Sequence, residues 1–118
     1  MGIVESLKSL LVTTQPELRK PRTKRSSQWP KVRAEHLKNH PACLVTGSTK
    51  ELEVHHIFPV HLFPELELSP ENLVTLSEGP TTNFHFLVGH LLDWRAYNPN
   101  VLEDAKEWFR KLKSRAYG

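Results

Sequence analysis

The chain has a single cysteine, Cys43, and lacks several features that mark secreted or membrane proteins. One cysteine cannot form a disulfide within the chain, and it gives no sign of an oxidising compartment. No apolar run approaches the ~20 residues that a transmembrane helix needs, and the first residues lack the charged and apolar regions of a secretory signal. The sequence also contains no internal repeat and no low-complexity tract. We therefore expect a soluble protein of the cytoplasm.

The size and charge of the chain favour one small domain with a nucleic-acid partner. A chain of 118 residues, 38% apolar and 25% charged, is typical of a single globular domain. The formal charge is only +3, but residues 19–38 contain eight lysines and arginines and one acid, Glu35. Such a block indicates a polyanion partner, although a solvated linker has the same composition. We expect phosphate contacts from Arg22, Lys24, Arg25, Lys31 and Arg33.

Helices are predicted at both ends of the chain. Apolar residues at helical spacing predict a short helix over residues 3–12, and a basic linker follows up to residue 26. Ser27 is a suitable N-cap for a second helix that reaches about Asn39. Residues 101–115 combine helical apolar spacing with acids early and bases late, which predicts a C-terminal helix. We therefore divide the chain into an arm, 1–26, and a domain, 27–118.

Short strands are predicted in the middle of the domain. Residues 42–46 and 52–58 favour two strands joined by a turn, and therefore an antiparallel pair. A proline-rich loop precedes another short strand over residues 72–76. Thr81 or Thr82 can cap a helix that runs toward Trp94.

Two adjacent histidines, His55 and His56, lie within the strand predicted at residues 52–58. Side chains on a strand alternate between faces, so the two rings cannot have the same role in regular geometry. A neutral imidazole binds transition-metal ions, and a pKa near 6.5 suits proton abstraction from water. One histidine can therefore bind a metal while its neighbour acts as an acid or base. Alone, the pair is as easily explained as two half-buried strand histidines.

The order of the chemical residues resembles the HNH, or ββα-metal, nuclease family. The resemblance covers about residues 41–99: Leu52–Pro59 is similar to the family's first motif, and Ser69–Leu76 to its second. It implies an α+β fold in which an antiparallel hairpin and a helix hold one divalent ion. It also implies a metal-dependent endonuclease that hydrolyses DNA phosphodiester bonds.

The resemblance also implies roles for individual residues. His55 would be a metal ligand, with further ligands from His85 and His90 on the helix, and His56 would be the general base that activates water. Asn72 would brace the loop and hold the His56 ring in position. Three imidazole ligands favour zinc, nickel or manganese over magnesium. The ion would stabilise charge on the scissile phosphate and the leaving 3′ oxygen.

Two features depart from the family pattern. His85 and His90 are five residues apart, which on a regular helix separates them by about 140°. Either His85 precedes the first regular turn, or Gly89 allows a local bulge, or only one histidine binds. Many HNH proteins also carry two Cys-x-x-Cys pairs, which one cysteine cannot supply, so we expect Cys43 to be a small buried hydrophobe.

Two functions are compatible with the sequence. The leading hypothesis is an endonuclease that cuts double-stranded DNA with low sequence specificity, because basic residues grip the phosphate backbone without reading bases. The alternative is a non-catalytic nucleic-acid-binding domain in which the metal is a structural staple. His56 and Asn72 argue against this alternative, since a structural site needs neither. The sequence is also compatible with a homodimer or a larger complex.

Overall fold

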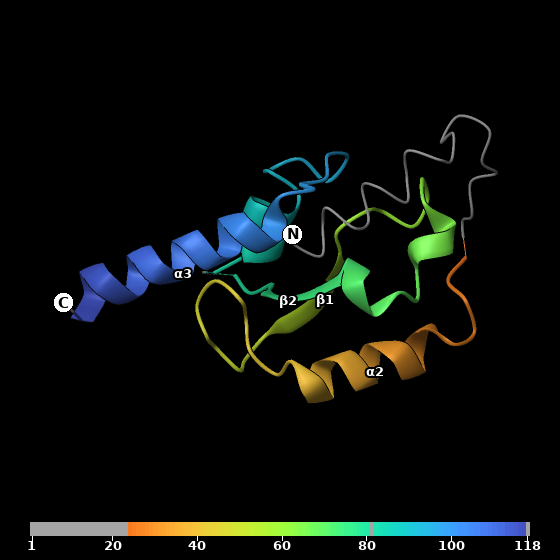
Figure 1. Cartoon of the computed structure of the whole chain (residues 1–118), viewed down its shortest axis with the longest axis horizontal. Coiled ribbons are helices and arrows are strands. Elements are labelled where there is room, and N and C mark those ends of the chain that lie inside the picture. Colours follow the sequence, from red (N-terminus) through yellow and green to blue (C-terminus); the bar gives the residue numbers. More distant parts are fainter. Residues whose placement is uncertain (1–23, 81, 118) are drawn as a thin grey trace.

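The computed structural model describes residues 24–80 and 82–117 and shows a small α+β fold (Figure 1). The predicted helix at 3–12 and Arg22 lie outside these residues. Two helices flank a two-stranded antiparallel sheet, and short helical turns connect the parts. In chain order the elements are α2 (Trp29–Asn39), β1 (Leu52–His56), η2 (Pro64–Leu66), η3 (Pro70–Asn72), β2 (Leu73–Ser77), η4 (His85–Gly89) and α3 (Val101–Tyr117).

Helix α2 confirms the predicted helix after the basic linker, but its N-terminus differs by one residue. The N-cap is Gln28 instead of Ser27, and its side chain makes no capping hydrogen bond. The buried Glu67 carboxylate lies near this end and accepts hydrogen bonds from the Ser26 backbone N–H at 3.0 and 3.2 Å. A carboxylate near a helix N-terminus is favoured by the helix dipole. Glu67 therefore ties the start of α2 to the loop between the strands.

The predicted pairing of residues 42–46 with β1 is wrong. Strand β1 pairs with β2, in a register that places Leu52 opposite Ser77 and His56 opposite Leu73. The segment at 42–46 curls instead, because Gly47 adopts a φ of 77° and donates a hydrogen bond to the Cys43 carbonyl at 2.8 Å. Every residue of β2 is buried, whereas only Cys43 and Val45 are buried in the 42–46 segment. Pairing β1 with β2 therefore places more apolar surface in the core.

The hydrophobic core lies between the sheet, the 42–46 turn and the start of α3. Its most buried members include Cys43, as predicted, together with Ile57, Leu76, Val101 and Ala105. The predicted C-terminal helix is confirmed as α3, and its later turns project away from the sheet (Figure 1). No helix in the described part of the chain has the length and apolar character needed to cross a membrane.

The helix predicted to run toward Trp94 is much shorter than expected. Only His85–Gly89 forms helical structure of the π type, after a helical Phe84. The helix ends because Leu91 and Leu92 adopt left-handed φ angles of 54° and 66°. Trp94 therefore lies in a loop that folds back toward the helix.

Candidate active site

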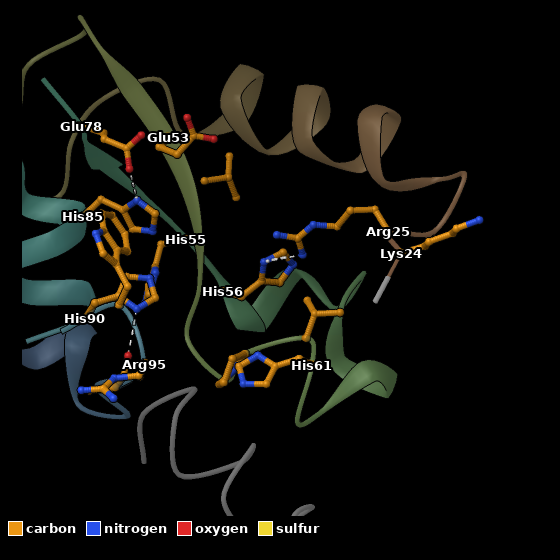
Figure 2. A pocket seen from close by; sticks show the side chains of 15 residues that line it. Lys24, Arg25, Glu53, His55, His56, His61, Glu78, His85, His90 and Arg95 are labelled. Atoms are coloured by element: carbon orange, nitrogen blue, oxygen red, sulfur yellow. Dashed lines mark hydrogen bonds and ion pairs between the residues drawn. The ribbon is translucent and has the colours of Figure 1, made fainter. Parts of the chain in front are cut away.

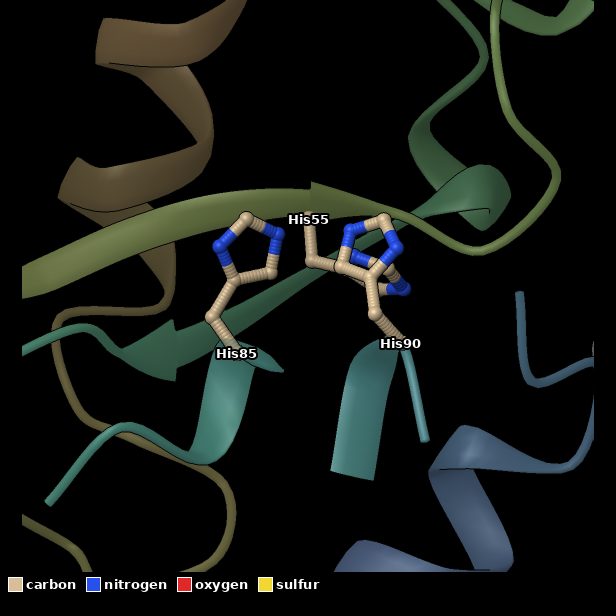
Figure 3. Close-up of side chains that lie close together, drawn as sticks. All are labelled: His55, His85 and His90. Atoms are coloured by element: carbon tan, nitrogen blue, oxygen red, sulfur yellow. The ribbon is translucent and has the colours of Figure 1, made fainter. Parts of the chain in front are cut away.

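Three histidines converge between β1 and η4 (Figure 3). His55 comes from the strand, and His85 and His90 come from the two ends of the helical turn. One ring nitrogen of each lies within 4.8 Å of those of the other two, and every pair of ring centroids is 4.9 Å apart. The three rings are therefore close enough to hold one metal ion.

The π-helical turn accounts for the unusual spacing of His85 and His90. Its defining bond runs from the His90 backbone N–H to the His85 carbonyl at 3.2 Å, five residues back. A π-type turn accommodates one more residue than an α-helical turn, so residues five apart come to lie on one face. Of the three alternatives open from the sequence, the structure adopts a local bulge that includes Gly89.

Glycine at position 89 lets the His55 ring approach the turn. A Cβ atom at Gly89 would lie 3.1 Å from the His55 atoms Cε1 and Nδ1 and 3.2 Å from Nε2. These distances are tighter than ordinary van der Waals contact, so any larger residue would push the His55 ring or the helical turn. Gly89 therefore supports the convergence of all three rings.

Hydrogen bonds fix the ring tautomers of the two helix histidines. His85 Nδ1 lies 2.7 Å from the Glu78 carboxylate, and His90 Nδ1 lies 2.9 Å from the Ala96 carbonyl. Because these oxygens only accept, Nδ1–H must be the donor in each ring, and Nε2 keeps a free lone pair. This is how metal-binding histidines are usually oriented. Glu78 was not predicted as a site residue; only its position at the end of β2 hinted at a role.

His55 has the most enclosed ring of the cluster. Its Nε2 atom is buried and has no hydrogen-bond partner within residues 24–80 and 82–117, which is costly unless another group satisfies it. Burial, followed by the proximity of His85, His90 and His56, holds the pKa of His55 well below its usual value. The ring is therefore neutral, the form that binds metals. An unsatisfied buried nitrogen beside two oriented Nε2 atoms fits a bound transition-metal ion.

His56 is held separately from the three-histidine cluster. Its Nε2–H donates to the Glu67 backbone carbonyl at 2.9 Å, and Trp29 of α2 packs on the ring with centroids 4.5 Å apart. Nδ1 therefore carries the lone pair, and Arg25 Nη1 lies 3.5 Å from it. Burial is the main cause that lowers the pKa of His56 to about 4, and Arg25 adds to the effect. The ring is neutral at pH 7, with one nitrogen available to accept a proton.

Asn72 is fully buried and holds together the start and the end of the loop between β1 and β2. This loop contains Glu67, whose carbonyl binds the His56 ring. Asn72 Oδ1 accepts from the Phe58 N–H at 2.8 Å, and its Nδ2 donates to the carbonyls of Phe58 at 3.0 Å and Leu66 at 3.1 Å. The next residue, Glu67, supplies the carbonyl that orients His56. Asn72 therefore acts on the His56 ring through the loop, with no direct contact to the ring among these bonds.

An open cleft of about 630 Å³ joins these parts (Figure 2). All four of the histidines described above line it, as do the basic residues Lys24, Arg25 and Arg95. The other predicted phosphate contacts differ: Arg33 forms an ion pair with Glu53 at 3.1 Å, and the exposed Lys31 does not line the cleft. Lys24 and Arg25 are thus the predicted cations that the fold brings to the site.

Neither a protein-family model, nor a curated protein, nor a solved structure matches this chain. The chemistry of the site therefore rests on its own side chains. In one cleft they provide three nitrogens for one ion, a neutral histidine whose Nδ1 carries a lone pair, and the cations Lys24, Arg25 and Arg95. This combination suits a reaction at a phosphate ester.

Proposed function

We propose that this protein is a metal-dependent endonuclease of the HNH type that hydrolyses phosphodiester bonds in DNA. The observation that carries the proposal is the pairing of two different histidine sites in one cleft. His55, His85 and His90 present nitrogens to a common point, whereas the adjacent His56 has its own partners: Nε2–H donates to the Glu67 carbonyl, and the basic Nδ1 faces Arg25 at the cleft. A structural metal site alone needs no such additional histidine.

His56 is the proposed general base. The Glu67 carbonyl fixes the ring through Nε2–H, so Nδ1 is the atom that takes a proton from the attacking water as its oxygen bonds to phosphorus. The same carbonyl stabilises the imidazolium that forms. The bond from phosphorus to the 3′ oxygen breaks, and the leaving oxygen takes a proton from solvent. An ion bound by the three histidines supplies charge stabilisation for the phosphate and the leaving oxygen.

Arg25 is the proposed phosphate contact nearest to the base. Arg25 Nη1 lies 3.5 Å from His56 Nδ1, and Arg25 Cζ lies 5.3 Å from the centre of the Trp29 ring. These two contacts hold the guanidinium beside the proposed base. An exposed guanidinium can bind phosphate oxygens in a bidentate manner. Arg25 would thus place the phosphate next to the atom that activates water.

Plasmid nicking tests the proposed reaction. We expect cleavage with manganese, nickel or zinc, no cleavage in EDTA, and a loss of about 10²- to 10⁴-fold in His56→Ala, the usual contribution of a general base. His61→Ala is the matched control, because this exposed histidine lines the same cleft and should leave cleavage near the wild-type level. If no metal supports cleavage while DNA binding persists, the protein is a metal-stapled binding domain instead.

A further inference from the structure

Trp94 forms an aromatic surface at the rim of the cleft, beside the histidine cluster. Its ring centroid lies 4.8 Å from that of His90, 5.3 Å from that of His85 and 4.7 Å from that of Phe86. The residue nevertheless remains 53% exposed and lines the cleft. One part of the indole is therefore supported by the rings around the ligand site, and the rest is open to a molecule in the cleft.

The loop that carries Trp94 is held in a strained conformation. Leu91 and Leu92 both adopt left-handed φ angles, which residues with a Cβ rarely do. Hydrogen bonds at 3.0 Å from the Leu92 N–H to the Phe86 carbonyl and from the Asp93 N–H to the His90 carbonyl hold this turn. Because both leucines are more than half exposed, core packing does not explain the strain. Such strain is concentrated at functional sites, and here it returns Trp94 to the histidines.

The charges near Trp94 indicate which molecule would cover it. Arg95 follows directly; its Nε lies 3.3 Å from the Asp93 carboxylate, but its side chain is 91% exposed, and Lys24 and Arg25 line the same cleft. An aromatic face beside cations is the combination that proteins use to bind single-stranded nucleic acid, in which bases stack on the ring and cations follow the phosphates. In an intact duplex the base faces are already stacked, so Trp94 could not reach them.

We propose that Trp94 stacks on an unpaired base next to the scissile phosphate. The substrate class is then single-stranded or locally unpaired DNA, such as a loop or flap, instead of the intact duplex expected from the sequence. This inference rests on the proposed nuclease function. Stacking would position the phosphate near the metal site, because the indole packs directly on two of the ligand rings.

Cleavage of designed oligonucleotides with manganese tests this proposal. We would compare a labelled single strand, its perfect duplex and a duplex with an unpaired loop, and we expect kcat/KM to be roughly 5- to 150-fold higher where the base is unpaired, the range given by one stacked base. A single abasic site would then be moved along the single strand. Wild type should lose activity at one position near the cut, and Trp94→Ala should have lost that sensitivity.

Trp94→Phe is the control variant, because it keeps an aromatic face and should retain part of the preference. Calorimetry would measure the metal affinity of both variants. An affinity near that of wild type indicates that Trp94 acts by stacking on the substrate, whereas a loss indicates that it supports the histidine rings. A flat abasic profile in wild type, or equal cleavage of duplex and single strand, would overturn the inference and leave the nuclease function intact. Failure to cut any substrate would overturn the proposed function itself.

Discussion

The backbone N–H of His90 donates a hydrogen bond to the backbone carbonyl of His85, so the two proposed ligands are the ends of a single π-type turn. The bond fixes the separation of their Cα atoms regardless of side-chain rotamer. It also brings Gly89 under the His55 ring. The geometry of the ligand set therefore depends on a backbone feature as much as on the histidines.

Gly89→Ala should disturb the metal site without removing a ligand. The new methyl group would lie 3.1 Å from the His55 ring, and relief of this contact requires the ring or the turn to shift. We expect metal affinity to fall, and the free energy of unfolding to fall by about 1–3 kcal/mol, the usual effect of overpacking. Calorimetric metal titration and urea unfolding would measure the two effects.

Gly79→Ala is the matched control for this variant. The atoms that a Cβ at Gly79 would meet belong to the end of the exposed Glu51 side chain, which can move away. Metal affinity in Gly79→Ala should therefore stay near the wild-type value. Equal losses in the two alanine variants would contradict the specific role of Gly89.

Glu78→Gln should weaken metal binding although Glu78 is not itself among the three converging residues. The carboxylate accepts from His85 Nδ1–H at 2.7 Å, which orients the ring and increases the basicity of Nε2. Glutamine keeps an accepting oxygen but loses the negative charge. We expect a loss of about 10- to 100-fold in metal affinity, measured by calorimetry with zinc or nickel. Glu71→Gln, an exposed substitution outside the cleft, should have no comparable effect.

His55→Ala and His56→Ala should separate metal binding from catalysis. His55 provides the buried nitrogen of the cluster, so its loss should reduce both metal affinity and DNA cleavage. His56 is hydrogen-bonded to Glu67 and lies outside the cluster, so its loss should reduce cleavage by about 10²- to 10⁴-fold and largely preserve metal affinity. Calorimetry and nicking on the same preparations would decide this. The reverse pattern would exchange the roles of the two residues.

The sequence was informative where chemistry depends on residue order. His55 and His56 on one strand, Asn72 at the start of another, and two further histidines led, through the resemblance to HNH nucleases, to the expectation of a hairpin, a helix and three histidine ligands. The three histidines do converge, but the strand predicted to pair with β1 was the wrong one. The partners that orient the rings were not predictable in the same way. The Ala96 carbonyl and the Glu78 carboxylate reach His90 and His85 through loop conformations that local sequence patterns do not specify.

Backbone geometry was also the source of the errors. The apolar run at 42–46 satisfies a strand pattern, but a left-handed Gly47 converts it into a turn. The helix toward Trp94 satisfies a helical pattern, but left-handed Leu91 and Leu92 end it early. Leucine is unfavourable in that conformation, so its identity gave no signal of a helix terminus. In both segments, tertiary structure overrides the local secondary-structure propensity of the sequence.

The metal-free protein should lose stability as the pH falls from about 6.5 toward 4. Burial, with a contribution from His40, lowers the pKa of His36 to about 4 in the folded state. Between this value and the unfolded pKa near 6.5, the unfolded chain binds more protons, so acidification favours unfolding. His55 and His56, whose pKa values are also lowered, contribute in the same direction. His36→Phe removes only the titration of His36 and should make the decline less steep, as measured by thermal unfolding in EDTA across this range. A decline as steep as that of wild type would show that His36 contributes little.

Leu92→Gly should stabilise the fold, contrary to the usual effect of introducing glycine. Leu92 has a φ of 66°, and the left-handed conformation costs a residue with a Cβ about 1–2 kcal/mol. Glycine removes this cost but loses about 0.5–1 kcal/mol through its greater freedom in the unfolded chain. The side chain is 61% exposed, so little packing is lost. We therefore expect a net gain of up to about 1 kcal/mol in urea unfolding with EDTA present.

Leu62→Gly is the control, because Leu62 is also exposed but does not have a positive φ angle. Glycine there relieves no strain and should destabilise the protein by about 0.5–1 kcal/mol. If both substitutions destabilised the protein equally, contacts of the Leu92 side chain would outweigh the strain. If only Leu92→Gly stabilised it while the preference for unpaired substrates fell, the strained turn would be maintained for the position of Trp94 and not for stability.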